Sequence, residues 1–246
     1  MLSNAEKGLK ACYAKYSLPM LETPRFVRFK FIKTGSLQFI SHLDLHRTIN
    51  RAVIRAGIPA WYTQGFNPHT RLVFAAPLSV GLQSIAEYFD LRVNRVMSPE
   101  EMMERLNLQL PSGMRIVEAF YPTTSFALIN WSEYELELYF DKETDLIKWQ
   151  ISTLFERSDI PVLKRTKSGE KDVNIRPMIR KMSYKQQGNC IKIRAVLSAC
   201  SMDYLNPEML IKAIVRHQPS VFGDELPRYR ITRTKLLLAD GITEFV

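Results

Sequence analysis

The stretch RFVRFKFIKTGSLQFISHLDLHRTINRAVIRAG, residues 25–57, contains the change of period that decides the fold. Its first ten residues, 25–34, mix aromatic residues with valine in an imperfect alternation, which is typical of a strand. Gly35 ends this strand. From Ser41 onward the apolar residues recur at helical spacing, and Gly57 stops the pattern as a glycine following a helix does. The stretch therefore predicts a strand followed by an amphipathic helix.

The rest of the first half adds three strands and one helix. Strands are predicted at residues 71–75, 87–93 and 114–121. Ser98, followed by a proline and two glutamates, predicts the start of the second helix. The order of elements is β-α-β-β-α-β, which is the order of a ferredoxin-like unit.

The second half repeats this order. Its predicted elements are strands at 133–140, 173–183, 190–198 and 229–238, and helices at 144–157 and 207–217. We therefore predict an α+β protein of two tandem ferredoxin-like modules, at residues 25–123 and 131–246, after an N-terminal extension at 1–24. The alternative is one continuous α+β domain with a larger mixed sheet.

Charge is distributed unevenly along the 246 residues, whose formal net charge is +9. Residues 25–71 carry eight basic side chains against the single acid Asp44, residues 72–160 have a net charge of −7, and residues 161–246 a net charge of +8. Two basic blocks around an acidic one predict a bipolar surface that attracts a polyanion. The alternative is a basic protein that binds no nucleic acid.

Several classes of protein are made improbable by composition. The chain has no long apolar run, so we expect neither a membrane span nor a secretory signal. Its three cysteines, Cys12, Cys190 and Cys200, lack metal-ligand spacing. We therefore expect a cytoplasmic protein without a disulfide, a bound metal or a cofactor.

The predicted first helix and its flanks supply the candidate nucleic-acid contacts. Arg47, Arg51 and Arg55 are spaced about one turn apart on the polar face, a row that suits a phosphate backbone. The alternative is a solvated helix face. Further cations in or near this block are Arg28, Lys30 and Lys33, and Arg176 is the candidate in the second module.

The segment WYTQGFNPH, residues 61–69, is a long connection of the kind that carries recognition residues. Gln64, Phe66 and Asn67 are predicted to contact nucleic acid, and the aromatic residues of the segment to stack on unpaired bases. The alternative is that the aromatic residues fix the loop to its own sheet.

His42, Asp44 and His69 form a candidate acid–base group, provided that the loop returns to the first helix. His42 and His46 also have the spacing of a helical metal pair, but no third ligand is placed by the pattern. A local role for these histidines is the simpler interpretation.

These motifs together resemble a bacterial domain-of-unknown-function family associated with radical-SAM proteins. The matching elements are Lys33, Gly35, Leu37 and Phe39 at the end of the first strand, Ser41–Asp44, the arginine-rich helix, Gln64–His69 and Asp172–Pro177. The resemblance spans Arg25 to Lys235. In that family the domain occurs alone or fused behind a radical-SAM enzyme. This chain lacks cluster-binding cysteines, so the resemblance implies the companion domain only.

Three functions are therefore expected, in order of preference. The first is an RNA-binding accessory module, without catalytic activity of its own, that presents tRNA or rRNA to a separate radical-SAM enzyme. The second is a metal-independent RNA endonuclease resembling the CRISPR repeat-processing enzymes. The third is a protein–protein adaptor that uses the acidic block at residues 72–160.

Overall fold

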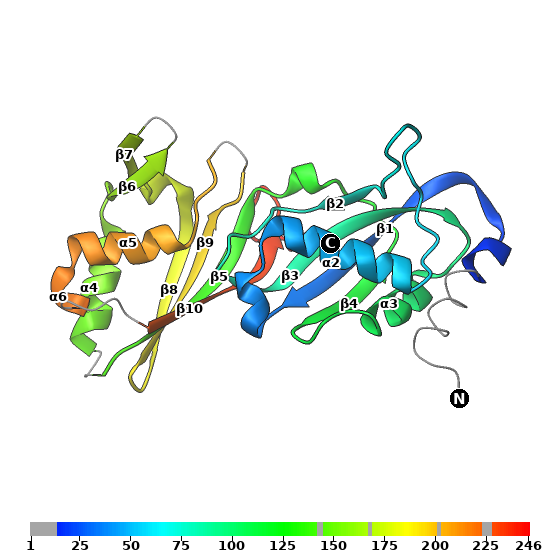
Figure 1. The fold of residues 1–246 in the computed structure, drawn as a ribbon. Helices are drawn as coiled ribbons and strands as arrows, with labels where there is room; N and C mark the ends of the chain where they lie inside the picture. Colours follow the sequence, from blue (N-terminus) through cyan, green and yellow to red (C-terminus); the bar gives the residue numbers. More distant parts are fainter. Residues whose placement is uncertain (1–13, 142–144, 167–168, 201–202, 223–227) are drawn as a thin grey trace. The chain divides into compact units, whose positions relative to one another are not determined.

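The computed structural model describes residues 14–246 except 142–144, 167–168, 201–202 and 223–227. The first thirteen residues of the predicted extension thus lie outside the described part. Contacts divide the chain into two units, Met1–Phe126 with Val246, and Ala127–Phe245. Both units combine helices with an antiparallel sheet (Figure 1), which confirms the α+β class.

In its described residues, the first unit contains four strands and two α-helices. They are β1 (Met20–Lys33), α2 (His42–Arg55), β2 (Leu72–Phe74), β3 (Gln83–Arg95), α3 (Pro99–Asn107) and β4 (Met114–Phe120), with short 3-10 helices at Lys15–Ser17 and Gly35–Phe39. The strands are ordered β4-β1-β3-β2, and all neighbours are antiparallel. Strand β1 begins five residues earlier than the alternation at Arg25 predicts.

The predicted helix boundaries are confirmed by their capping contacts. The Ser41 hydroxyl accepts the backbone N–H of Asp44 at 3.1 Å, and the Ser98 hydroxyl accepts that of Glu101 at the same distance. Gly57, with φ of 65°, follows the last turn of α2 and donates its N–H to the carbonyl of Ile54.

Both helices of the first unit pack on one face of its sheet. The core joins β1 side chains such as Phe29 to Ile49 of α2 and Leu106 of α3. Because successive side chains of a strand point to opposite faces, Phe26 and Arg28 of β1 lie on the face away from the helices.

The described part of the second unit contains a four-stranded sheet, a separate hairpin and three α-helices. They are β5 (Trp131–Tyr139), α4 (Asp145–Glu156), β6 (Pro161–Thr166), β7 (Gly169–Asn174), β8 (Ile179–Gln187), β9 (Cys190–Ser198), α5 (Glu208–His217), α6 (Pro219–Phe222) and β10 (Arg228–Leu237). The main sheet has the order β10-β5-β9-β8 with antiparallel neighbours, and β6 pairs with β7.

The prediction of one strand at residues 173–183 was wrong. Strand β7 ends at Asn174, a 3-10 turn covers Arg176–Met178, and β8 starts at Ile179. Pro177 has no N–H to give to a sheet, and the Asn174 side chain accepts the N–H of Arg176 at 2.9 Å. The hairpin β6–β7, which this turn separates from β8, was not predicted.

Candidate nucleic-acid interface

The exposed face of α2 carries the predicted arginine row. Arg47 pairs with Asp44 at 3.3 Å, and Arg55 donates to the backbone carbonyl of Gln109 at 3.0 Å. Within the described part of the chain, Arg51 is exposed and has no ion-pair partner. The row is therefore not neutralised by carboxylates of the acidic block, and Arg51 can take an external anion.

Asp44 is occupied by contacts within its own helix. The Ser41 hydroxyl donates to one carboxylate oxygen at 2.7 Å, and Arg47 donates to the other at 3.3 Å. The hydrogen bond from Ser41, followed by the hydrogen bond and charge of Arg47 and by the charge of Arg51, lowers the pKa of Asp44. Asp44 thus stabilises the start of α2, and its described contacts do not include His42 or His69.

The connection between α2 and β2 folds back as a small hairpin. Tyr62 and Thr70 form a bridge, and the N–H of Thr63 donates to the carbonyl of His69 at 2.9 Å. At its base, the Thr70 hydroxyl donates to the side chain of Asn50 in α2 at 2.8 Å. This contact fixes the base of the loop against α2, whereas the tip, residues 64–68, is exposed.

His69 is oriented by the loop in which it lies. Its Nδ1 is 3.1 Å from the carbonyl oxygen of Asn67 and 3.1 Å from the Thr63 hydroxyl. A carbonyl oxygen only accepts, so Nδ1 carries the proton in this contact. In the neutral ring, Nε2 is then an unprotonated acceptor, and it has no hydrogen-bond partner among the described residues.

His42 and His69 both lie within electrostatic range of His46. Burial, followed by the positive charges of His42 and His69, lowers the pKa of His46. The rings of His42 and His46 lie 5.2 and 6.0 Å from the ring of Phe74 in β2. The base of the loop and α2 therefore lie close together, and the described residues contain no group of three or more ligands that could hold a metal ion.

Two of the predicted phosphate contacts are buried instead. Arg28 is 1% exposed and forms a two-pronged ion pair with Asp90, at 2.8 and 3.0 Å. Lys33 is 2% exposed. Lys30 is partly exposed and pairs with Glu118 at 3.1 Å. Arg28 and Lys33 are thus too deeply buried for a phosphate to reach them.

The central strands of the second unit neutralise their own charges. Glu135 and Glu137 of β5 lie between cations of β9 and β10. The ion pairs are Lys192–Glu137 at 3.0 Å, Arg194–Glu135 at 3.8 Å, Arg230–Glu137, Arg228–Asp141 at 3.0 Å and Lys235–Glu244 at 3.3 Å. The cations of β10 therefore do not form the open basic surface that their number in the sequence indicates.

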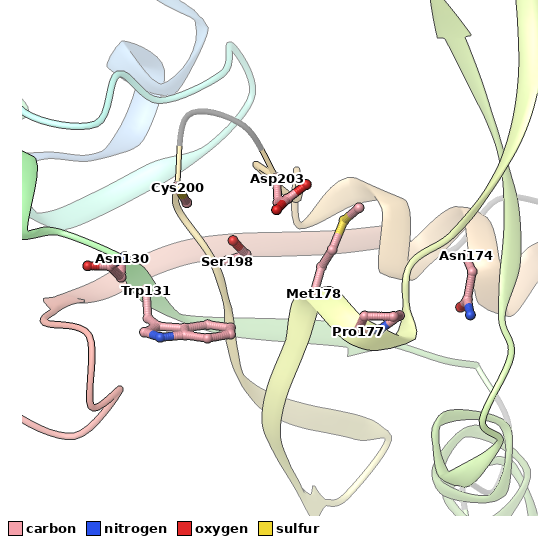
Figure 2. Close-up of a pocket in the computed structure, with 8 residues that line it drawn as sticks. All are labelled: Asn130, Trp131, Asn174, Pro177, Met178, Ser198, Cys200 and Asp203. Carbon is pink, nitrogen blue, oxygen red and sulfur yellow. The ribbon is translucent and has the colours of Figure 1, made fainter.

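Arg176 also turns toward its own backbone. Its guanidinium donates to the carbonyl of Ile179 at 2.9 Å, within the 3-10 turn. The neighbouring cavity, of about 370 Å³, is lined by Asn130, Trp131, Asn174, Pro177, Met178, Ser198, Cys200 and Asp203 (Figure 2). Its lining contains a carboxylate and no cation, so it does not suit a phosphate group. Cys190 and Cys200 are free thiols, and Cys12 lies outside the described residues.

The positioning residues of the site were not identified from the sequence. Asn50 and Thr70 hold the loop to α2, Thr63 orients His69, and Phe74 packs against two histidines. Asn50 offered one signal, since it is a polar residue next to the apolar stripe of α2. The other three contacts depend on how the loop closes, which no spacing reveals.

The chain belongs to a bacterial family described as "Uncharacterized protein conserved in bacteria (DUF2344)", whose model matches residues 27–207. Helix α2 and its loop both lie inside this range. No curated protein matches the chain significantly.

Two solved structures resemble the chain weakly. They are an unknown protein from Galdieria sulphuraria, with a TM-score of 0.25, and a putative glycine cleavage system transcriptional repressor, with a TM-score of 0.24. In each case the sequence identity is 10%, and the match covers 86% of this chain and 99% of the other. Neither likeness indicates a function.

No helix in the described part of the chain is both long and apolar enough to cross a membrane.

Proposed function

We propose that this protein binds RNA through its first unit. The observation that carries the proposal is a set of guanidinium groups without carboxylate partners among the described residues, on Arg51 of α2, Arg71 before β2 and Arg92 of β3. An arginine that is not neutralised within its own protein attracts phosphate strongly. The exposed tip of the loop, with Phe66 fully accessible, adds groups that contact bases.

The partner in this proposal is a separate radical-SAM enzyme that modifies tRNA or rRNA in the cytoplasm. The motif resemblance supports this part, and the chain itself acts as an RNA-holding module without catalytic activity. In this view the two units are two ferredoxin-like modules. Their matching strand orders, β4-β1-β3-β2 and β10-β5-β9-β8, support that interpretation.

A salt titration with paired variants tests RNA binding. Arg51→Gln removes a charge without an ion-pair partner among the described residues, and Arg194→Gln removes a charge that is also exposed but pairs with Glu135. For binding of bulk tRNA followed by fluorescence anisotropy, we expect Arg51→Gln to reduce the slope of log K against log salt by about 1. Arg194→Gln should leave the slope unchanged.

Two results would contradict the proposal. The first is the absence of RNA retention at low salt. The second is an equal effect of the two substitutions, which would mean that overall charge matters and the first unit does not. Co-purification with the radical-SAM enzyme, unaffected by nuclease treatment, would instead favour the adaptor function.

The histidine group supports a second candidate, metal-independent RNA cleavage. Nε2 of His69 would take the proton of a ribose 2′-hydroxyl as its oxygen attacks the adjacent phosphorus, and protonated His42 would give a proton to the departing 5′-oxygen. Arg47 would steady the phosphate. This candidate predicts cleavage in the presence of a chelator that is lost in His42→Ala. Intact RNA after prolonged incubation would exclude it.

A further inference from the structure

Four side chains on the second face of the first unit form an alternating ladder of cations and rings. The guanidinium of Arg71 lies 5.7 Å from the centre of the Phe26 ring, and that of Arg92 lies 5.8 Å from the same centre. Arg92 also lies 4.6 Å from the centre of the Trp61 ring. The order is therefore Arg71, Phe26, Arg92, Trp61.

The backbone fixes the ladder across three segments. Phe26 and Arg92 are direct partners of β1 and β3. The N–H of Trp61 donates to the carbonyl of Arg92 at 2.8 Å, and the N–H of Arg92 donates to the carbonyl of Arg71 at 3.1 Å. Phe26 and Arg92 of the ladder thus stand on β1 and β3, on the face opposite α2, and backbone hydrogen bonds hold Arg71 and Trp61 beside Arg92.

Both guanidinium groups of the ladder retain hydrogen-bonding capacity. Asp90, the acid nearest to Arg92 along β3, is committed to Arg28. In the described part of the chain, Nε of Arg92 is shielded from solvent without a hydrogen-bond partner. Arg71, at the end of the ladder, is exposed and makes no ion pair with a described residue. The exposed Arg71 and the half-buried Arg92 are therefore open to an external anion.

The flat shape of the ladder restricts the kind of anion. A guanidinium plane stacks on a nucleobase and donates N–H groups to phosphate in the same arrangement. Bases inside a duplex are already stacked and do not offer a free face. A ligand that both stacks and carries a phosphate is therefore an unpaired nucleotide within a single strand.

We infer that the Arg71–Phe26–Arg92–Trp61 ladder binds an unpaired nucleotide of RNA, with the base stacked on the Arg71 end and its phosphate held by the guanidinium groups. This inference rests on the proposed RNA binding and specifies its ligand as single-stranded RNA. It also assigns to the second face of the sheet a role separate from that of α2.

The Arg71→Lys variant tests the inference, because lysine keeps the charge and lacks the flat stacking surface. The matched control is Arg105→Lys on α3, where Glu101 neutralises the arginine at 2.6 Å. Anisotropy measures the affinity of each protein for a labelled RNA oligonucleotide, first single-stranded and then annealed to its complement. Ultraviolet crosslinking followed by peptide mapping locates the bound strand.

We expect Arg71→Lys to weaken binding of the single strand roughly tenfold and to leave duplex binding and the melting temperature unchanged. Arg105→Lys should match the unaltered protein, and crosslinks should include peptides with Phe26 or Trp61. If Arg71→Lys binds the single strand as the unaltered protein does, the ladder is not the site, although RNA binding by the first unit stands. If no RNA of either form is retained, both proposals fail.

Discussion

The buried ion pair between Arg28 and Asp90 gives the sharpest test of how the first unit is held together. The Arg28 side chain is 1% exposed and that of Asp90 is 14% exposed. The guanidinium makes two bonds to Asp90 and two more, each of 2.8 Å, to the hydroxyl and carbonyl of Thr124. The ring of Phe126 lies 4.3 Å from its central carbon. Arg28 therefore ties the end of the first unit to its sheet.

Replacing one partner leaves the other charge buried. Asp90→Leu removes both carboxylate contacts and leaves the guanidinium with the neutral acceptors of Thr124, so we expect a loss of about 3 kcal/mol. For a unit of this size that corresponds to a fall in melting temperature of about 10 °C. The double variant Arg28→Met/Asp90→Leu has no buried charge at this place and should recover most of the loss.

The test is a double-mutant cycle. Circular dichroism follows the thermal unfolding of Asp90→Leu, of Arg28→Met and of the double variant. Because Arg28 is covered, RNA affinity of the double variant should equal that of the unaltered protein. The reasoning is refuted if Asp90→Leu costs less than about 1 kcal/mol, or if the two single losses simply add in the double variant. If a stable double variant lost RNA binding, Arg28 would have to be counted among the residues that contact RNA.

Three further predictions concern the site and its supports. Burial and two neighbouring histidines lower the pKa of His46. The unfolded chain therefore binds more protons than the folded chain, and the stability should fall as the pH drops below about 6.5. His46→Gln should flatten this dependence in thermal melts between about pH 5 and 7. Ser41→Ala removes the cap of α2 and should cost about 1 kcal/mol in urea unfolding. Gly113→Ala places a Cβ 2.7 Å from the Thr34 carbonyl at a φ of 85° and should cost about 2 kcal/mol or more in thermal unfolding, whereas Gly188→Ala, with open space around it at a φ of 56°, should cost less.

The local elements of this protein were predictable because short-range chemistry determines them. Ser41, Gly57 and Ser98 mark helix ends through contacts within a few residues. The approach of the loop to α2 was only a condition of the proposed His42–His69 group, because their positions along the chain do not fix the distance between them.

Long-range pairing explains what the sequence did not reveal. An alternating pattern places Arg28 on the polar face of β1, but only the folded chain brings Asp90 and Thr124 onto it, from 62 and 96 residues away. The β6–β7 hairpin escaped notice because the segment 164–172 is polar on both sides of its strands. The role of Asp44 could not be decided from the sequence, because an aspartate can either cap a helix or act as an acid–base group.

The self-neutralised strands of the second unit have a consequence for solution measurements. Glu135 and Glu137 already pair with Lys192, Arg194 and Arg230. This face would therefore displace few of the mobile ions that are condensed on an approaching phosphate chain. Its contact with a nucleic acid would therefore gain little entropy from counterion release. The ionic-strength dependence of the intact protein then reports mainly on the arginines of the first unit.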